Sequence, residues 1–147
     1  MIDRFERFSF AISDISRYWH KIAADEMEPY GLKGPYAVYF TTLYRYPEGV
    51  SAARLAELCS RDKADVSRAL TRLEERGLLE RTGSTSAYRA PVRLTAEGRH
   101  LAALINERAR AAVEVGGKGL TEEQRNTFYT ALELICANLH TLTEQGL

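Results

Sequence analysis

The side chains best suited to chemistry gather in one short segment, SRDKADVSRALTRLEERG at residues 60–77. The apolar spacing predicts a helix over residues 63–75, with a core face formed by Val66, Ala69, Leu70 and Leu73. The other face gathers one ammonium group, two guanidinium groups and two hydroxyls, from Lys63, Arg68, Arg72, Ser67 and Thr71. Arginine can donate two hydrogen bonds to guanine, and serine or threonine can contact base edges or phosphates. The pattern therefore predicts a helix that contacts DNA.

A solvated helix surface is the simpler interpretation of the same face. Arg72 and Glu75 are three residues apart, a spacing at which opposite charges pair on helices that face only water. The flanking segments favour DNA binding. A short helix, SAARLAELCS at residues 51–60, precedes a tight turn, and LLERT (78–82) and APVRLT (90–95) predict two strands. This is the order of a helix-turn-helix, whose second helix enters the major groove, followed by a β-hairpin wing.

Residue types at the helix ends support these boundaries. Ser51 is placed to cap the short helix, and Asp62 is placed to cap the one after it. Gly77 is placed to end that second helix. The wing loop carries Arg89, which we expect within reach of phosphates or a minor groove, and Arg81 is a second candidate for that contact.

Four further helices are predicted outside this motif. One covers the first 30 residues, one begins at Gly34-Pro35, one runs over about residues 96–115, and the last opens with a capping box at residues 121–124. The first and last carry heptad-like apolar stripes, which suit either an internal core or a helical dimer interface. The stripe residues taken as dimerisation candidates are Phe5, Phe8, Ile12, Ile15, Phe128, Leu132, Ile135, Leu139 and Leu142. The predicted fold is mainly α with a small β-hairpin wing.

Composition is that of one globular domain of 147 residues with no net charge. The charge is unevenly spread: residues 51–99 hold 10 basic and 7 acidic side chains, for +3, between ends of −1 and −2. This is a weak sign of a polyanion-binding patch. We expect no membrane segment, no secretory signal and, by default, a cytoplasmic location.

Two stretches of the sequence resemble the MarR family of transcriptional regulators. They are GLKGPYAVYFTTLYRYPEGVSAARLAELCSRDKADVSRALTRLEERGLLERT (31–82) and VRLTAEGR (92–99). The resemblance implies a recognition helix at residues 62–75 and a wing at residues 78–95. It also implies a winged-helix region at 31–95 and a helical dimerisation region at 1–30 and 96–147. The expected function is a homodimeric regulator, most simply a repressor, on a pseudo-palindromic operator.

The wing departs from the family pattern. Family members usually carry an Asp-Arg-Arg or similar run before the VRLT strand, whereas this chain has Ser86-Ala87-Tyr88-Arg89. The aspartate that normally braces the wing arginine is therefore absent.

The resemblance also implies release by a small anionic or phenolic effector bound between the dimerisation helices and the winged helix. Aromatic side chains dense in the first two helices are the pocket candidates, although such residues also form ordinary cores. They are Trp19, His20, Tyr36, Tyr39, Phe40 and Tyr44.

Two other functions stay open. Zero net charge and the atypical wing suit a winged-helix adaptor that binds protein instead of DNA. Cys59, close in sequence to Arg61 and Lys63, suits a thiol-based redox sensor, although a lone cysteine is more often a small apolar side chain. The three histidines have no metal-site spacing, and no catalytic motif is present, so we expect no metal, no cofactor and no enzymatic activity.

Overall fold

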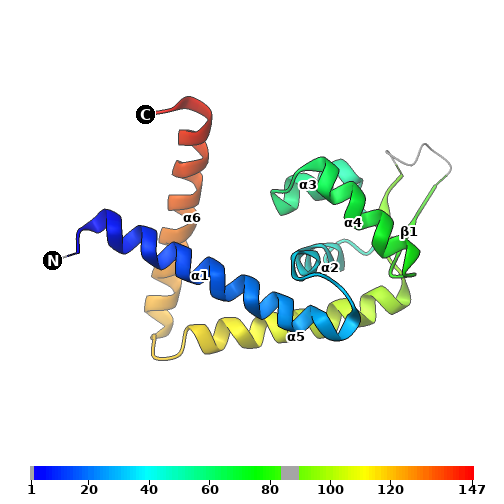
Figure 1. Cartoon of the computed structure of the whole chain (residues 1–147), viewed down its shortest axis with the longest axis horizontal. Helices are drawn as coiled ribbons and strands as arrows, with labels where there is room; N and C mark the ends of the chain where they lie inside the picture. Colours follow the sequence, from blue (N-terminus) through cyan, green and yellow to red (C-terminus); the bar gives the residue numbers. More distant parts are fainter. Residues whose placement is uncertain (1, 84–89) are drawn as a thin grey trace. The chain divides into compact units, whose positions relative to one another are not determined.

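The computed structural model describes residues 2–83 and 90–147, and it divides into two compact units, Met1–Arg108 and Ala109–Leu147. Arg89, the predicted wing-tip cation, lies outside the described residues. The chain is mainly helical, with one two-stranded antiparallel sheet (Figure 1). The predicted fold class is therefore confirmed.

The first unit contains most of the elements. In chain order they are α1 (Arg4–Met27), the 3₁₀ turns η1 (Glu28–Tyr30) and η2 (Gly34–Tyr36), α2 (Ala37–Tyr44), α3 (Ala52–Cys59), α4 (Lys63–Glu75), β1 (Leu79–Arg81) and β2 (Val92–Leu94). The helix α5 (Ala96–Gly116) begins in this unit and ends in the second, which also holds α6 (Glu122–Gln145). The helix expected to begin at Gly34-Pro35 opens with a 3₁₀ turn, and its α-helical part starts at Ala37.

The sheet is the two-stranded wing, in which Leu79, Glu80 and Arg81 pair with Leu94, Arg93 and Val92. Val50 adds an isolated bridge to Val92, where each backbone N–H donates to the other residue's carbonyl at 3.1 and 2.8 Å. A one-residue bridge has no periodicity, so sequence reasoning could not predict it. The bridge ties the segment before α3 to the second wing strand.

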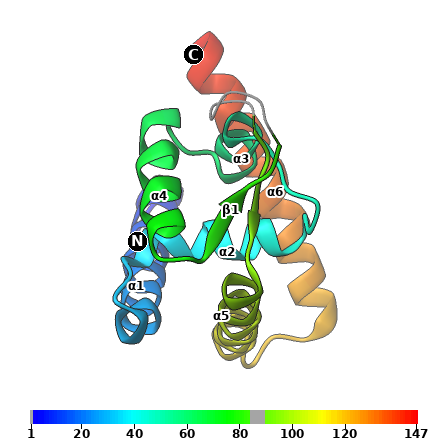
Figure 2. The same ribbon diagram turned by 90° about the vertical axis from the view of Figure 1, so that its right-hand side faces the viewer.

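A single core fills the first unit. Its largest fully buried side chains come from the end of α1, from α2, α3 and α4, and from β2: Phe40, Met27, Leu43, Leu55, Leu70, Leu73, Val66 and Val92. Figure 2 shows α4 beside β1 in this unit, and the two elements are in contact. The core face of α4 is therefore covered by the elements that the motif predicts around it.

The LTAEG segment joins the wing to α5 through close backbone contact. The Thr95 hydroxyl donates to the Gly77 carbonyl at 2.7 Å and accepts from the Gly98 N–H at 3.1 Å. The Thr95 N–H donates to the Leu78 carbonyl at 3.1 Å. A Cβ at Gly98 would lie 2.0 Å from that same carbonyl oxygen. Only glycine fits this position without moving the backbone.

All three residues predicted to cap helix N-termini occupy the N-cap position, and two of them make the capping hydrogen bond. The Ser51 hydroxyl accepts from the Arg54 N–H at 3.1 Å, and Thr121 and Gln124 form the capping box at the start of α6. Asp62 occupies the N-cap position of α4, but its side chain makes no capping hydrogen bond. Asp62 is exposed, so water can solvate its carboxylate instead.

In the second unit, Arg125 holds the turn between α5 and α6. Its Nη1 donates to Glu114 Oε2 at 2.6 Å and its Nη2 donates to the Gly117 carbonyl at 3.1 Å. The hydrogen bond to Glu114 raises the pKa of Arg125, which keeps the guanidinium charged. A side chain of α6 therefore binds both the last turn of α5 and the residue that follows it.

Candidate nucleic-acid interface

The two faces of α4 divide as the sequence predicted. Val66, Ala69, Leu70 and Leu73 are at most 1% exposed. The five candidate DNA-contacting side chains of this helix are all exposed: Lys63, Ser67, Arg68, Thr71 and Arg72. The core face orients the helix, and so the cations and hydroxyls point outward together. This surface, made by those five side chains, is called the recognition face below.

The turn between α3 and α4 is defined by its backbone conformation and hydrogen bonds. Ser60 adopts a left-handed backbone with φ of 51°, an uncommon conformation for a residue other than glycine. The Arg61 N–H donates to the Ala56 carbonyl at 3.0 Å, and the Ser60 N–H donates to the Glu57 carbonyl at 3.2 Å. These bonds close the end of α3 before α4 begins. The result is a compact helix-turn-helix.

Local contacts modify the recognition face. Arg68 forms an ion pair with Asp65 one turn earlier in α4. The Thr71 hydroxyl donates to the Ser67 carbonyl at 3.0 Å, which leaves the Thr71 oxygen free to accept and its methyl group exposed. Lys63 lies at the first position of the helix, where uncompensated N–H groups favour a phosphate. The face thus offers donors for phosphates and base edges.

The wing strands carry two arginines, and both are ion-paired. Arg93 Nε lies 2.7 Å from Glu80 Oε1 across the sheet, and Arg81 Nε lies 3.0 Å from Glu74 Oε2 on α4. The Arg81 side chain is only 23% exposed. Arg81 therefore joins the wing to the recognition helix, which is a structural role that sequence reasoning missed.

Comparison with known proteins agrees with this geometry. A family model described as the MarR family matches residues 30–90, the segment from η1 to the wing. A MarR transcriptional regulator from Methanosarcina mazei Go1 is 25% identical, with a TM-score of 0.80, over 93% of this chain and 99% of that one. Residues 30–90 match the MarR family, and the chain shares the fold of a MarR transcriptional regulator. Curated protein sequences give no match.

Two further solved structures share the fold. A Listeria monocytogenes structure, solved in complex with a 26mer DNA, is 23% identical with a TM-score of 0.83, over 99% of this chain and 97% of that one. S. aureus MepR, solved in a DNA-binding conformation, is 20% identical with a TM-score of 0.80, over 90% of this chain and 98% of that one. The fold is that of MarR-family transcriptional regulators.

The six aromatic pocket candidates lie in different surroundings. Tyr39 and Phe40 are buried in the core, and burial raises the pKa of Tyr39. Tyr36 and Tyr44 are half-buried, and the Arg99 guanidinium lies over the Tyr44 ring at 4.8 Å. Trp19 and His20 are exposed on α1. The structure brings Tyr36 and Tyr39 together, with ring centroids 6.2 Å apart, and places the buried Phe40 away from any surface.

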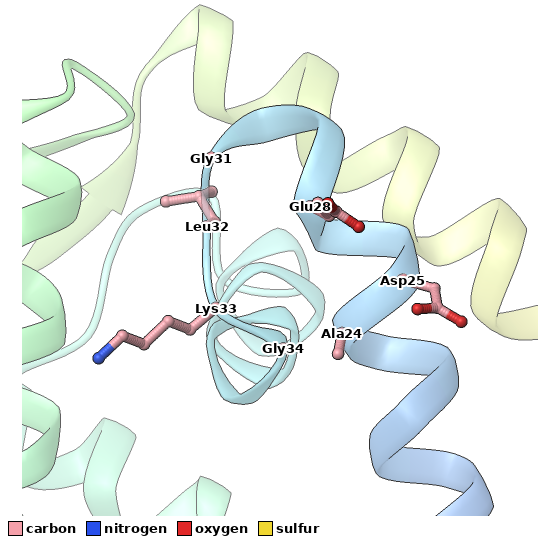
Figure 3. A pocket seen from close by; sticks show the side chains of 7 residues that line it. All are labelled: Ala24, Asp25, Glu28, Gly31, Leu32, Lys33 and Gly34. Carbon is pink, nitrogen blue, oxygen red and sulfur yellow. The ribbon is translucent and has the colours of Figure 1, made fainter.

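An open hollow of about 490 Å³ lies where α1 turns into η2. Figure 3 shows its lining, which contains none of the six aromatic candidates: Ala24, Asp25, Glu28, Gly31, Leu32, Lys33 and Gly34. It is open to solvent and its side chains do not converge on one point, so its geometry favours no particular ligand.

Cysteines and metal-binding groups give little further chemistry. Cys59 is half-buried, and its thiol lies 3.5 Å from the Thr42 hydroxyl, whereas Cys136 is exposed on α6. Among residues 2–83 and 90–147, no three histidine, cysteine or acidic side chains are placed to share a metal ion. In the same part of the chain, no helix combines the length and the apolar character needed to cross a bilayer.

The apolar stripes of α1 and α6 are largely uncovered in the single chain. On α1, Phe5 is 74% exposed and Phe8, Ile12 and Ile15 are also exposed. On α6, Phe128, Leu139 and Leu142 are exposed, and Leu132 and Ile135 are half-buried. Contiguous exposed apolar surface of this kind marks interaction sites in soluble proteins.

Proposed function

We propose that this protein is a sequence-specific DNA-binding transcriptional regulator that reads an operator with its recognition face. The observation that carries the proposal is the outward set of cations and hydroxyls on α4, which a fully buried core face holds in place. Arginine and hydroxyl side chains on a helix that fits the major groove are the groups that read base edges. The Listeria structure with the same fold, solved in complex with a 26mer DNA, supports DNA as the partner.

The working form is a homodimer on a pseudo-palindromic operator. The exposed stripes of α1 and α6 support dimerisation, because a second copy would remove their apolar side chains from water. In this proposal residues 1–30 and 96–147 form the dimerisation region and residues 31–95 the DNA-binding region. Two-fold symmetry then places two recognition helices about one helical turn of DNA apart.

Repression released by a small aromatic effector is the regulatory form that we propose. A dimer bound to the operator can repress by blocking transcription sterically, and this needs no further partner protein. Of the six candidate aromatic residues, Tyr36 and Tyr44 are half-buried and Trp19 and His20 are exposed, so these four keep surface to offer a ligand within the first unit. An effector acts only through different affinities for the DNA-competent and incompetent states.

The test is selection from a randomised pool of duplex DNA, followed by fluorescence anisotropy at two salt concentrations. A selected palindrome and an affinity that falls steeply with salt are expected, because phosphate contacts release counterions. Arg68→Ala and Arg72→Ala should each cost roughly 1–3 kcal/mol at one base position if the contact is bidentate. Arg45→Ala, an exposed arginine at the end of α2, is the matched control and should leave base preference unchanged.

A protein-binding adaptor is the second candidate, and one observation favours it. Arg68, Arg81 and Arg93 are all ion-paired to carboxylates, which offsets part of the positive charge on and beside the recognition face. An adaptor would bind no duplex above nonspecific levels even at low salt. A thiol-based redox sensor, the third interpretation, requires that Cys59→Ser abolish a peroxide response of DNA binding.

A further inference from the structure

Arg76 connects the C-terminal end of the recognition helix to the end of α1. It is the residue that follows α4 and caps it, and its side chain reaches across to the chain segment before η2. Arg76 Nη2 donates to the Tyr30 carbonyl at 2.7 Å, and Nη1 donates to the Gly31 carbonyl at 3.4 Å. Gly31 and Tyr30 lie 45 and 46 residues before Arg76, in the connection between α1 and η2.

The two carbonyls that Arg76 binds lie where the first helical run ends. The Leu32 N–H donates to the Met27 carbonyl at 3.3 Å, and the Gly31 N–H donates to the Glu28 carbonyl at 2.9 Å. Carbonyls in the last turn of a helix have no partner within it and are often satisfied by a cationic side chain. Gly31 has φ of 66°, a turn that glycine makes easily. The turn presents the Tyr30 and Gly31 carbonyls to the guanidinium.

This connection is held firmly to α1. A Cβ at Gly34 would lie 2.8 Å from the Ala24 backbone nitrogen, so the chain passes against α1 at backbone contact distance. Met27, in the last turn of α1, is fully buried in the core. A displacement of α1 therefore moves the Tyr30 and Gly31 carbonyls with it. Figure 3 shows the same turn from Glu28 to Gly34 along α1.

We propose that Arg76 is a positioning residue that fixes the recognition helix relative to α1, and so sets the half-site spacing that the dimer accepts. The inference rests on the proposed function, because α1 carries part of the proposed dimer interface. The core face of α4 holds the helix within the winged-helix core. Arg76 adds a fixed point outside that core, at the end of the helix, between the DNA-reading element and the dimerisation element.

The experiment uses the full-length protein and duplexes that carry the selected half-sites at their preferred spacing and at one or two base pairs more or less. Wild type should bind the preferred spacing best. Arg76→Gln should lower that affinity about three- to tenfold and flatten the dependence on spacing, because the helix end is no longer fixed. Arg76→Lys, which keeps a cationic donor, should retain most of the preference. Arg45→Gln removes the same charge and should behave like wild type.

Salt dependence separates positioning from a direct phosphate contact. A positioning role leaves the slope of log affinity against log salt unchanged in Arg76→Gln. A slope reduced by about one, with the spacing preference intact, would mean that Arg76 touches a phosphate and would overturn the inference. Equal affinity and spacing preference in wild type and Arg76→Gln would also overturn it, while the proposed function would stand. If wild type binds no duplex, the proposed function and this inference fall together.

Discussion

Arg108 donates two hydrogen bonds to Glu26, from Nε at 3.0 Å to Oε2 and from Nη2 at 2.9 Å to Oε1. The pair joins α5 to α1 across 82 residues of chain, within the first compact unit. The hydrogen bond and the positive charge of Arg108 together lower the pKa of the Glu26 carboxyl, although partial burial acts in the opposite direction. Bidentate pairing of this kind fixes orientation as well as distance. It adds a polar link between α1 and α5 beside the core that Met27 shares with Leu101 and Ile105.

The Glu26–Arg108 pair should make stability depend on acid pH. Because the folded-state pKa of Glu26 lies below its unfolded value, the contribution is complete above the unfolded pKa of about 4.3 and is lost as the pH falls through the folded-state value. Urea unfolding of wild type and Glu26→Gln should differ at pH 7 and converge below about pH 4. In an Arg108→Gln background, Glu26→Gln should no longer cause a pH-dependent difference in the free energy of unfolding. A gap between wild type and Glu26→Gln that is constant down to pH 3 would contradict this account.

Gly98→Ala should destabilise the protein strongly. The added Cβ would meet the Leu78 carbonyl oxygen at 2.0 Å, so α5 and the wing strand must separate. The expected loss is about 3 kcal/mol in the free energy of unfolding, which exceeds the helix-propensity gain of about 1 kcal/mol. Denaturant unfolding measures it.

Gly116→Ala is the control for this substitution. Gly116 is the last residue of α5, and a Cβ there meets no atom within 4 Å. Its stability should change by less than about 1 kcal/mol. Similar losses in the two variants would show that the close contact at Gly98 is not the cause.

Asp65→Asn should tighten DNA binding under the proposed function. Asp65 pairs with Arg68 on the recognition face, and its removal frees the guanidinium and takes one negative charge away from the phosphates. Exposed pairs contribute a fraction of a kcal/mol, so a gain of about two- to fivefold in affinity is expected. Asp14→Asn on α1 breaks a pair of the same i,i+3 spacing with Arg17 and is the control. Weaker binding by Asp65→Asn in anisotropy titrations, with folding intact, would mean that Arg68 needs its partner for orientation.

Charges placed on the α6 stripe should separate the proposed dimer. Leu132→Glu with Leu139→Glu puts two carboxylates into an apolar contact, where burying a charge costs several kcal/mol. The dimer dissociation constant should rise roughly 100-fold or more, and operator affinity should fall with it. Thr130→Glu with Thr141→Glu adds the same charge to the opposite face of α6, where both residues are exposed. Sedimentation velocity compares the two variants, and an unchanged dimer in the leucine variant would place the interface elsewhere.

Sequence reasoning predicted α4 well because three local signals agree there. The apolar period, the turn before Lys63 and the stop at Gly77 all depend on residues close in sequence, and the helix spans Lys63–Glu75 as expected. The strands are shorter than predicted, at Leu79–Arg81 and Val92–Leu94, although single backbone hydrogen bonds from Thr82 to Pro91 and from Thr95 to Leu78 continue the pairing beyond them. Among the aromatic residues, no sequence pattern could separate the buried Phe40 from the exposed Trp19.

The contacts that link distant segments were out of reach of sequence reasoning. Nothing in the local sequence distinguishes Arg76, Arg81 and Arg108 from other surface arginines. Their roles depend on acceptors that only folding brings close. The predicted DNA contact of Arg89 stays a prediction. So do the effector pocket and the dimer interface, because each needs a partner molecule to define it.

The separation of α4 into a buried face and an outward face has a consequence for how such a protein changes over generations. Folding depends on Val66, Ala69, Leu70 and Leu73, which share no position with Ser67, Arg68, Thr71 and Arg72. Under the proposed function, substitutions at the second set change which DNA sequence is read and leave the packing of the core intact. A duplicated copy of the gene can therefore acquire a new target through a few codons without first passing through an unstable protein.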